Sequence, residues 1–303
     1  MSGDTTPVAV TASDSGEVAA AHERRPLLEA WRSFRRDPGS LVALAFVLLV
    51  IALSLFAPYI SPYDPFEAVA SRNAAPLEPG VLLGADADGR DVLSRLLWGG
   101  RISLVTGIVP TFLATIVSLM IGIAAGYAGG WIDQALMRTL DIFFAFPLVL
   151  VAIVVAGILT PSIYTVMIAI FIALIPYIAR LVRTTTLMVK TQPYVEAARA
   201  GGARESAVVF RYILPNTVAP VIVYATTLIG MMMVLGSALS FLGLGVQPPT
   251  ADWGLMISEG RTVLRRAPHV TIFPGIMIVL VALAFGFIGD GLRDALDPRL
   301  RSR

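Results

Sequence analysis

Residues 196–215, EAARAGGARESAVVFRYILP, are the one stretch whose residue types and spacing predict a specific chemical task. The alanines of EAARA have minimal side chains, so another protein surface could approach the backbone closely. Glu196, Arg199 and Arg204 would surround that surface with charged contacts that fix register and partner choice. The predicted chemistry is protein docking. An exposed loop whose arginines only set membrane topology would account for the same residues.

A helix, a glycine bend and a second helix are predicted to carry this stretch. Helix-favouring residues begin near Tyr194, Gly201 and Gly202 interrupt them, and the helical pattern resumes up to Pro215. A proline is tolerated in the first turn of a helix, where its missing N–H costs least. We therefore expect Pro215 to begin the next helix.

Other kinds of chemistry find no support in the sequence. Cysteine is absent, so thiolate metal sites and disulfides are excluded. There is no HExxH metalloprotease motif and no Walker A loop, and His22 and His269 are far apart in the chain. The formal net charge of +2 does not indicate a nucleic-acid partner.

The composition is that of a membrane protein. Hydrophobic residues make up 56% of the 303 residues and charged residues only 15%, against about 25% in soluble domains. The mean hydropathy is +0.77. The residues of the docking stretch must therefore be positioned by helices embedded in a lipid bilayer.

Six apolar segments are long enough to cross a membrane, which needs roughly 20 mostly apolar residues. They are 41–60, a charge-free run over 102–132, two spans within 142–179 separated by Thr160–Pro161–Ser162, a span near 221–242 and a span over 270–288. None of them contains Asp, Glu, Lys, Arg or His, which disfavours a proton-coupled carrier. The sequence predicts an all-α, polytopic membrane protein with six transmembrane helices.

The N-terminal region contains two further segments. Residues 1–23 are polar and lack the apolar core of a signal peptide, and we expect them to be disordered. Within 24–37, large apolar residues recur at helical spacing among five arginines. This pattern is typical of a basic amphipathic helix at the membrane surface, or of a solvated segment leading into the first span.

Lysine and arginine collect in three regions that six spans place on one side, the cytoplasm. These are the arginines of 24–37, six basic residues against two acids in 180–211, and four arginines after residue 288. Both termini are therefore predicted to be cytoplasmic. The acidic connection 61–100 falls outside. Arg261, Arg265 and Arg266 also fall outside, contrary to the rule.

The stretch EAARAGG followed by ILPN resembles the EAA loop of bacterial ABC-importer permeases. In that loop Glu-Ala-Ala is followed by three residues and Gly, and Leu-Pro comes about a dozen residues later; the matching residues are Glu196, Ala197, Ala198, Gly202, Leu214 and Pro215. FAPYISPYDP, GRDVLSRLLWGGRISL, SFLGLGVQPPTADWG and GDGLRDALDPRLR resemble recurring segments of the dipeptide/oligopeptide (nickel) transport subfamily. The resemblance is to the C-type permease of the pair. Ala85 stands where the subfamily usually has Thr, and Gly201 where a larger apolar residue is common.

This resemblance implies a type I ABC-importer permease fold in the bacterial cytoplasmic (inner) membrane. The loop would be a coupling helix that docks into a cleft on a cytoplasmic ATPase, and the implied contact residues are Glu196, Ala197, Ala198, Arg199, Gly202, Ala203, Leu214 and Pro215. Two ATPase subunits or domains would bind ATP and Mg, so this chain would hold no cofactor and be no enzyme. The other implied partners are a second homologous permease and an extracytoplasmic substrate-binding protein.

The implied function is inward movement of peptides or similar small solutes by alternating access. Nickel complexes and glutathione are other substrates of the subfamily. An ATP-independent secondary carrier or channel is the alternative. An intramembrane enzyme is a third hypothesis, and no set of catalytic residues in the sequence supports it. The expected organisation is a cytoplasmic tail (1–23), an amphipathic lead, first span and outer connection (24–100), a five-span permease core with the coupling helix (101–291) and a cytoplasmic tail (292–303).

Overall fold

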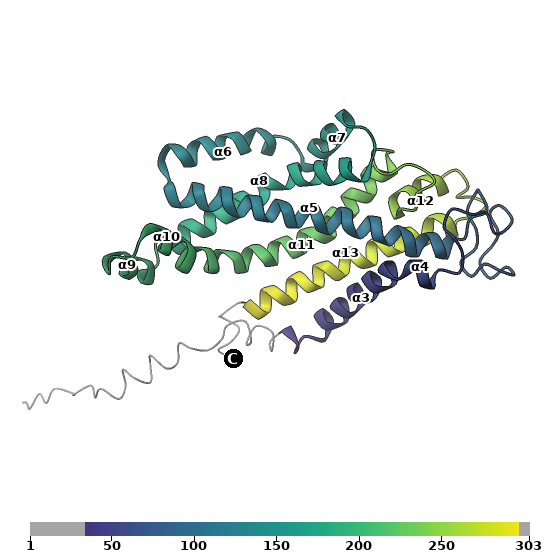
Figure 1. The fold of residues 1–303 in the computed structure, drawn as a ribbon, viewed down its shortest axis with the longest axis horizontal. Helices are drawn as coiled ribbons and strands as arrows, with labels where there is room; N and C mark the ends of the chain where they lie inside the picture. The colour runs from purple at the N-terminus through teal and green to yellow at the C-terminus, as the bar shows by residue number, and fades with distance from the viewer. Residues whose placement is uncertain (1–33, 297–303) are drawn as a thin grey trace, which may run out of the picture.

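The computed structural model describes residues 34–296, and its long helices lie side by side (Figure 1). Within this range the chain forms helices, turns and two isolated β-bridges, Ala68 with Arg90 and Ala85 with Asp91, but no strand. The all-α prediction is confirmed. The expected disordered segment 1–23 and all but the end of the amphipathic segment 24–37 lie outside the described residues.

The helices follow one another along the chain with short connections, except before α5. In order they are α3 (Pro38–Leu55), α4 (Ala57–Ile60), α5 (Val92–Ala128), α6 (Gly130–Phe144), α7 (Leu148–Ile158), α8 (Ile163–Lys190), α9 (Pro193–Ala200), α10 (Glu205–Ala207), the π-helical η2 (Val208–Ile213), α11 (Leu214–Phe241), α12 (Trp253–Gly260) and α13 (His269–Leu296). The short α9 and α10 lie at one end of the bundle, and α4 and α12 lie at the other (Figure 1).

Five helical segments in the described part of the chain are long and apolar enough to cross a membrane: α3, α5, α8, α13 and the continuous helical run Glu205–Phe241. A sixth is obtained if α6 and α7 count as one span with an 84° bend. The third predicted span is therefore not one straight helix. Pro147 disfavours helical backbone at Phe146 before it, and it sits at the N-cap of α7.

Several helices also extend beyond the predicted spans. α5 begins at Val92 rather than near Ile102, because the Asp91 carboxylate accepts a hydrogen bond from Ser94 N and caps the helix. α8 continues past Ala179 and includes Arg180 and Arg183. These arginines pair with acids on α6, Arg180 with Asp141 and Arg183 with Asp133.

Close packing of α5 against α8 rests on two glycines. A Cβ on Gly122 would lie 2.5 Å from Val182 Cβ, and one on Gly126 would lie 2.9 Å from Thr186 Cβ. The four-residue spacing of these glycines on α5 thus marks a helix contact, as in other membrane bundles. Gly130 extends the spacing in sequence but has no neighbour within 4 Å of such a Cβ, because it lies beyond the turn that ends α5.

Candidate functional site

The predicted glycine bend is present and has the geometry of a Schellman motif. After α9, Gly202 has φ +79°, Gly202 N donates to Arg199 O at 2.9 Å, and Ala203 N donates to Ala198 O at 3.1 Å. These two bonds satisfy carbonyl groups that the end of a helix leaves without partners. Gly201, with φ −77°, has an ordinary backbone conformation. The bend therefore depends on Gly202 and not on Gly201.

The residues of the predicted docking surface differ in their exposure. Glu196, Ala197, Gly202 and Pro215 are exposed. Ala198, Arg199, Ala203 and Leu214 are half-buried. On α9, the predicted residues that are open to a partner are therefore one carboxylate and one small residue, Glu196 and Ala197, and the larger Tyr194 is exposed on the same helix.

A small hydrophobic cluster, here called the hinge cluster, packs against α9 through the buried Val195. Its buried members are Val189, Val195, Val208 and Ile213, with Tyr127, Ala203 and Tyr212 packed against them. These residues come from α5, α8, α9, the bend and η2. α9 is thereby held against the ends of three longer helical segments instead of standing free in the solvent.

Arg199 occupies a position that the sequence analysis did not predict. Its guanidinium carbon lies 5.5 Å from the centre of the Tyr127 ring on α5, within cation–π distance. Its side chain therefore makes a contact within the chain. Glu196 and Arg204, by contrast, are exposed and remain open to a partner.

The start of α11 differs from the prediction for Pro215. Helical structure runs without a break from Glu205 through η2 into α11, so Pro215 lies inside a continuous helical run. η2 has π-helical i→i+5 geometry, a local widening that accompanies irregularities in helices. Pro215 is nevertheless in the first turn of α11.

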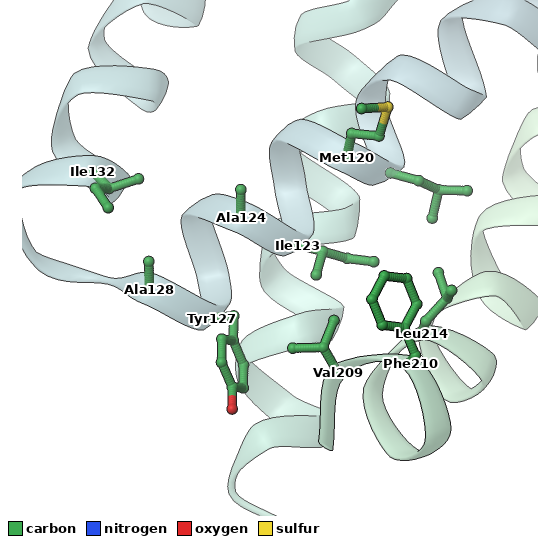
Figure 2. Close-up of a pocket in the computed structure, with 10 residues that line it drawn as sticks. Met120, Ile123, Ala124, Tyr127, Ala128, Ile132, Val209, Phe210 and Leu214 are labelled. Carbon is green, nitrogen blue, oxygen red and sulfur yellow. The ribbon is translucent and has the colours of Figure 1, made fainter. Parts of the chain in front are cut away.

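Leu214 borders an apolar groove of about 440 Å³ between α5 and the η2–α11 junction. Figure 2 shows Phe210 and Leu214 on one side of it, and Ile123 and Met120 of α5 on the other. Tyr127 lines the groove beside Val209. Leu214 therefore packs beside α5 and follows Ile213 of the hinge cluster in the chain.

A buried charge cluster at the opposite end of the bundle was missed by the sequence analysis. The Arg95 guanidinium pairs with Glu259 at 2.7 Å, and Arg90 Nε pairs with Asp86 at 2.8 Å. Arg90 also pairs with Asp88 at 2.7 Å. Burial raises the pKa of Glu259, and the nearby positive charges of Arg95 and Arg90 oppose that rise.

The same end contains a second buried acid, Asp252, which caps α12. Its carboxylate accepts hydrogen bonds from Ser103 Oγ at 2.7 Å and from Leu255 N at 3.1 Å. Burial raises the pKa of Asp252, and the hydrogen bonds from Ser103 and Leu255 lower it in part. Trp253 Nε1 donates to Leu96 O at 2.9 Å. These contacts hold α12 against the first turns of α5.

No group of three or more His, Asp or Glu side chains within residues 34–296 is arranged to hold a metal ion. The buried charge cluster and the exposed face of α9 differ in what their charges contact. The buried cluster pairs its charges within the chain and joins α5 to α12, and Arg95 Nε is its one buried side-chain atom without a hydrogen bond in the described residues. On α9, Glu196 and Ala197 are exposed to solvent.

Comparison with known proteins gives consistent matches. The family described as binding-protein-dependent transport system inner membrane component matches residues 118–302. The family described as N-terminal TM domain of oligopeptide transport permease C matches residues 25–77.

Among individual relatives, the glutathione transport system permease protein GsiD of Pectobacterium atrosepticum is 44% identical over 281 residues, covering 92% of this chain and 93% of that protein. The protein of the same name from Escherichia coli is also 44% identical, covering 92% of each. A chain of the inward-facing MetNI methionine ABC transporter is 18% identical, with a TM-score of 0.51 over 66% of this chain and 97% of that one. The last match concerns the fold alone.

Proposed function

We propose a coupling mechanism for this chain, which belongs to the family of binding-protein-dependent transport system inner membrane components and is a permease subunit of an ATP-driven importer. It is a multi-pass protein of the bacterial inner membrane and not itself an enzyme. In the proposal, α9 is the coupling helix. Its exposed face, with Glu196 and Ala197, docks on a cytoplasmic ATPase subunit.

The single observation that carries this proposal is the form of the α9 bend. The small side chains of α9 allow a partner's backbone to come close, and the Schellman motif at Gly202 fixes the direction in which the chain leaves the helix. The hinge cluster gives α9 a firm support, so a displacement of the docked helix would move α8 and the η2–α11 run with it.

The family indicates which classes of partner this permease has, and the roles given to them below are part of the proposal. The family implies ATPase subunits, a substrate-binding protein and a second permease. ATP and Mg would bind to the two ATPase subunits, and this chain would form the translocation path together with a homologous permease. Alternating access would deliver the substrate from an extracytoplasmic binding protein to the cytoplasm.

We assign peptides or peptide-like small solutes as the substrate class. The relatives named above carry glutathione transport in their names, and a matched family carries oligopeptide transport. Glutathione and short peptides share a zwitterionic backbone and amide bonds. Uptake of glutathione and of trialanine into vesicles that contain the complete importer would distinguish them, and uptake that persists without ATP would contradict the mechanism.

Docking is tested by a bulky residue on the exposed face of α9. Ala197→Trp should lower the amount of ATPase subunit that co-purifies with the permease, because the indole prevents close approach. Ala75→Trp, at an exposed position in the outer connection, is the matched control and should leave co-purification unchanged. Normal co-purification of the Ala197→Trp complex would contradict the docking surface.

The orientation is tested separately, because the chain contains no cysteine. Ala197→Cys should react with a membrane-impermeant maleimide only from the cytoplasmic side, and Ala75→Cys only from outside. Labelling of both positions from one side would exclude the proposed topology.

A further inference from the structure

Tyr127 lies near the end of the long helix α5, next to α9 and the hinge cluster. It lies in the last turn of α5, one residue before the helix ends at Ala128. Its ring packs against the hinge cluster and also lines the apolar groove beside Val209 (Figure 2). Although Tyr127 is far from α9 in sequence, its ring contacts Arg199 of α9.

Two cations from different helices contact this tyrosine. The Arg199 guanidinium of α9 lies 5.5 Å from the ring centre, and the Lys190 ammonium at the end of α8 lies 5.4 Å from it. Lys190 Nζ also donates a hydrogen bond to Tyr127 O at 2.6 Å. The ring is half-buried, and cation–π contacts partly shielded from water are stronger than exposed ones.

The ring rather than the hydroxyl makes these contacts. Within the described residues, the Tyr127 hydroxyl is buried and has no hydrogen-bond partner. The hydroxyl can therefore be removed without breaking a hydrogen bond, whereas removal of the ring would take away both cation–π contacts and part of the hinge cluster, and would leave the Lys190 hydrogen bond to the backbone oxygen. This difference separates the two variants that test the residue.

Near Tyr127, α5 also packs tightly against α8. Gly122 and Gly126, five residues and one residue before Tyr127, bring α5 against Val182 and Thr186 of α8. A displacement that reaches Tyr127 therefore reaches a tightly packed pair of membrane helices. Packed cores of this kind shift as units and do not deform continuously.

We infer that Tyr127 is a positioning residue that transmits movement of α9 to α5, with Arg199 as its contact on the coupling helix. The inference rests on the proposed docking of α9. It assigns Arg199 an inward role: the guanidinium links the docked helix to α5 and is not part of the ATPase-facing surface. Tyr127 touches neither substrate nor nucleotide and acts through α5.

The test uses fluorescent labels in the complete reconstituted importer, one label at a time. Met120→Cys, exposed on α5 in the cytoplasmic half, reports on that helix, and Arg204→Cys, exposed after the bend, reports on the coupling region. Addition of ATP and orthovanadate should change the fluorescence of each label in the otherwise unchanged protein. In Tyr127→Leu the Arg204→Cys response should persist while the Met120→Cys response falls about threefold or more.

Two variants separate transmission from a purely structural role. Tyr127→Phe keeps the ring and should restore the Met120→Cys response, and Arg199→Met should reproduce the loss seen with Tyr127→Leu. An unchanged Met120→Cys response in Tyr127→Leu would overturn the inference and leave docking intact. Absence of any Arg204→Cys response in the parent importer would instead refute the docking of α9, and the inference with it.

Discussion

The Arg95 guanidinium and the Glu259 carboxylate form an ion pair, 2.7 Å from Nη2 to Oε2, although 164 residues separate them in the chain. The Arg95 side chain is 1% exposed and that of Glu259 21%. This pair joins the beginning of α5 to α12. It therefore holds together the end of the bundle opposite to α9 (Figure 1).

Removal of Arg95 should destabilise the protein strongly. Arg95→Met removes the closer of the two cations at Glu259, at 2.7 Å against 3.4 Å for Arg90. Breaking a buried pair costs up to about 3–5 kcal/mol, and Arg90, which still pairs with Asp86 and Glu259, should keep the loss toward the lower end of that range. Thermal unfolding in detergent should show the loss. Arg72→Met, at an exposed position between α4 and α5, is the control and should change stability little. Equal unfolding temperatures for the two variants would show that the pair has no stabilising role.

The destabilisation by Arg95→Met should also depend on pH. Burial already raises the pKa of Glu259 above its ordinary value of 4.5, and loss of Arg95 removes a charge that lowers it. A carboxyl whose pKa is higher in the folded state favours folding below its unfolded pKa, and this advantage is lost as the pH rises through the folded pKa. The stability gap to the parent protein should therefore be small near pH 4.5 and widen toward neutral pH. A gap that does not change between those values would exclude Glu259 as its source.

The bend after α9 could be predicted from the sequence because its determinants are local. A helix of small residues followed by glycine specifies a C-terminal cap within a few positions, and Gly202 is found in that role. The inward position of Arg199 could not be predicted in this way. It depends on Tyr127, which is 72 positions earlier in the chain and comes close only when α5 packs against α8.

The buried charge cluster and the bent third span escaped prediction for related reasons. Hydropathy distinguishes apolar from polar stretches, so it identified 61–100 only as an acidic connection and could not show which of its charges are buried. Arg90 and Arg95 are instead buried beside Glu259, which comes from α12. Likewise, the run from Ile142 to Leu159 contains no charge, but its direction is set by Pro147 and by packing against α8.

Packing between α5 and α8 should be sensitive to a single methyl group. Gly122→Ala would place a Cβ 2.5 Å from Val182 Cβ and 2.7 Å from Ala179 O, and such overpacking costs about 1–3 kcal/mol. Gly286→Ala on α13 is the matched control, because nothing lies within 4 Å of its Cβ. Both changes improve helix propensity equally, so a lower unfolding temperature for Gly122→Ala alone would identify the clash. An equally stable Gly122→Ala protein would mean that α5 and α8 can separate at no cost.

Gly202 should be required for coupling but not for membrane insertion. At φ +79° a β-branched residue is strained by about 1–2 kcal/mol, so Gly202→Val should move the chain out of the left-handed conformation and break the Schellman motif. No neighbouring atom lies within 4 Å of the added Cβ, so the effect comes from the backbone and not from a clash. In the reconstituted importer, the amount of substrate transported per ATP hydrolysed should fall while the amount of inserted protein stays normal.

The adjacent glycine provides the control for this prediction. Gly201 has φ −77°, which alanine adopts readily, and a Cβ there would lie 3.4 Å from Ala197 O, an ordinary contact. Gly201→Ala should therefore transport as much substrate per ATP as the parent protein. If Gly202→Val also does so, the direction of the chain after α9 does not matter for coupling. If Gly201→Ala fails as well, small size at the bend is required, and the left-handed backbone at Gly202 is not the specific determinant.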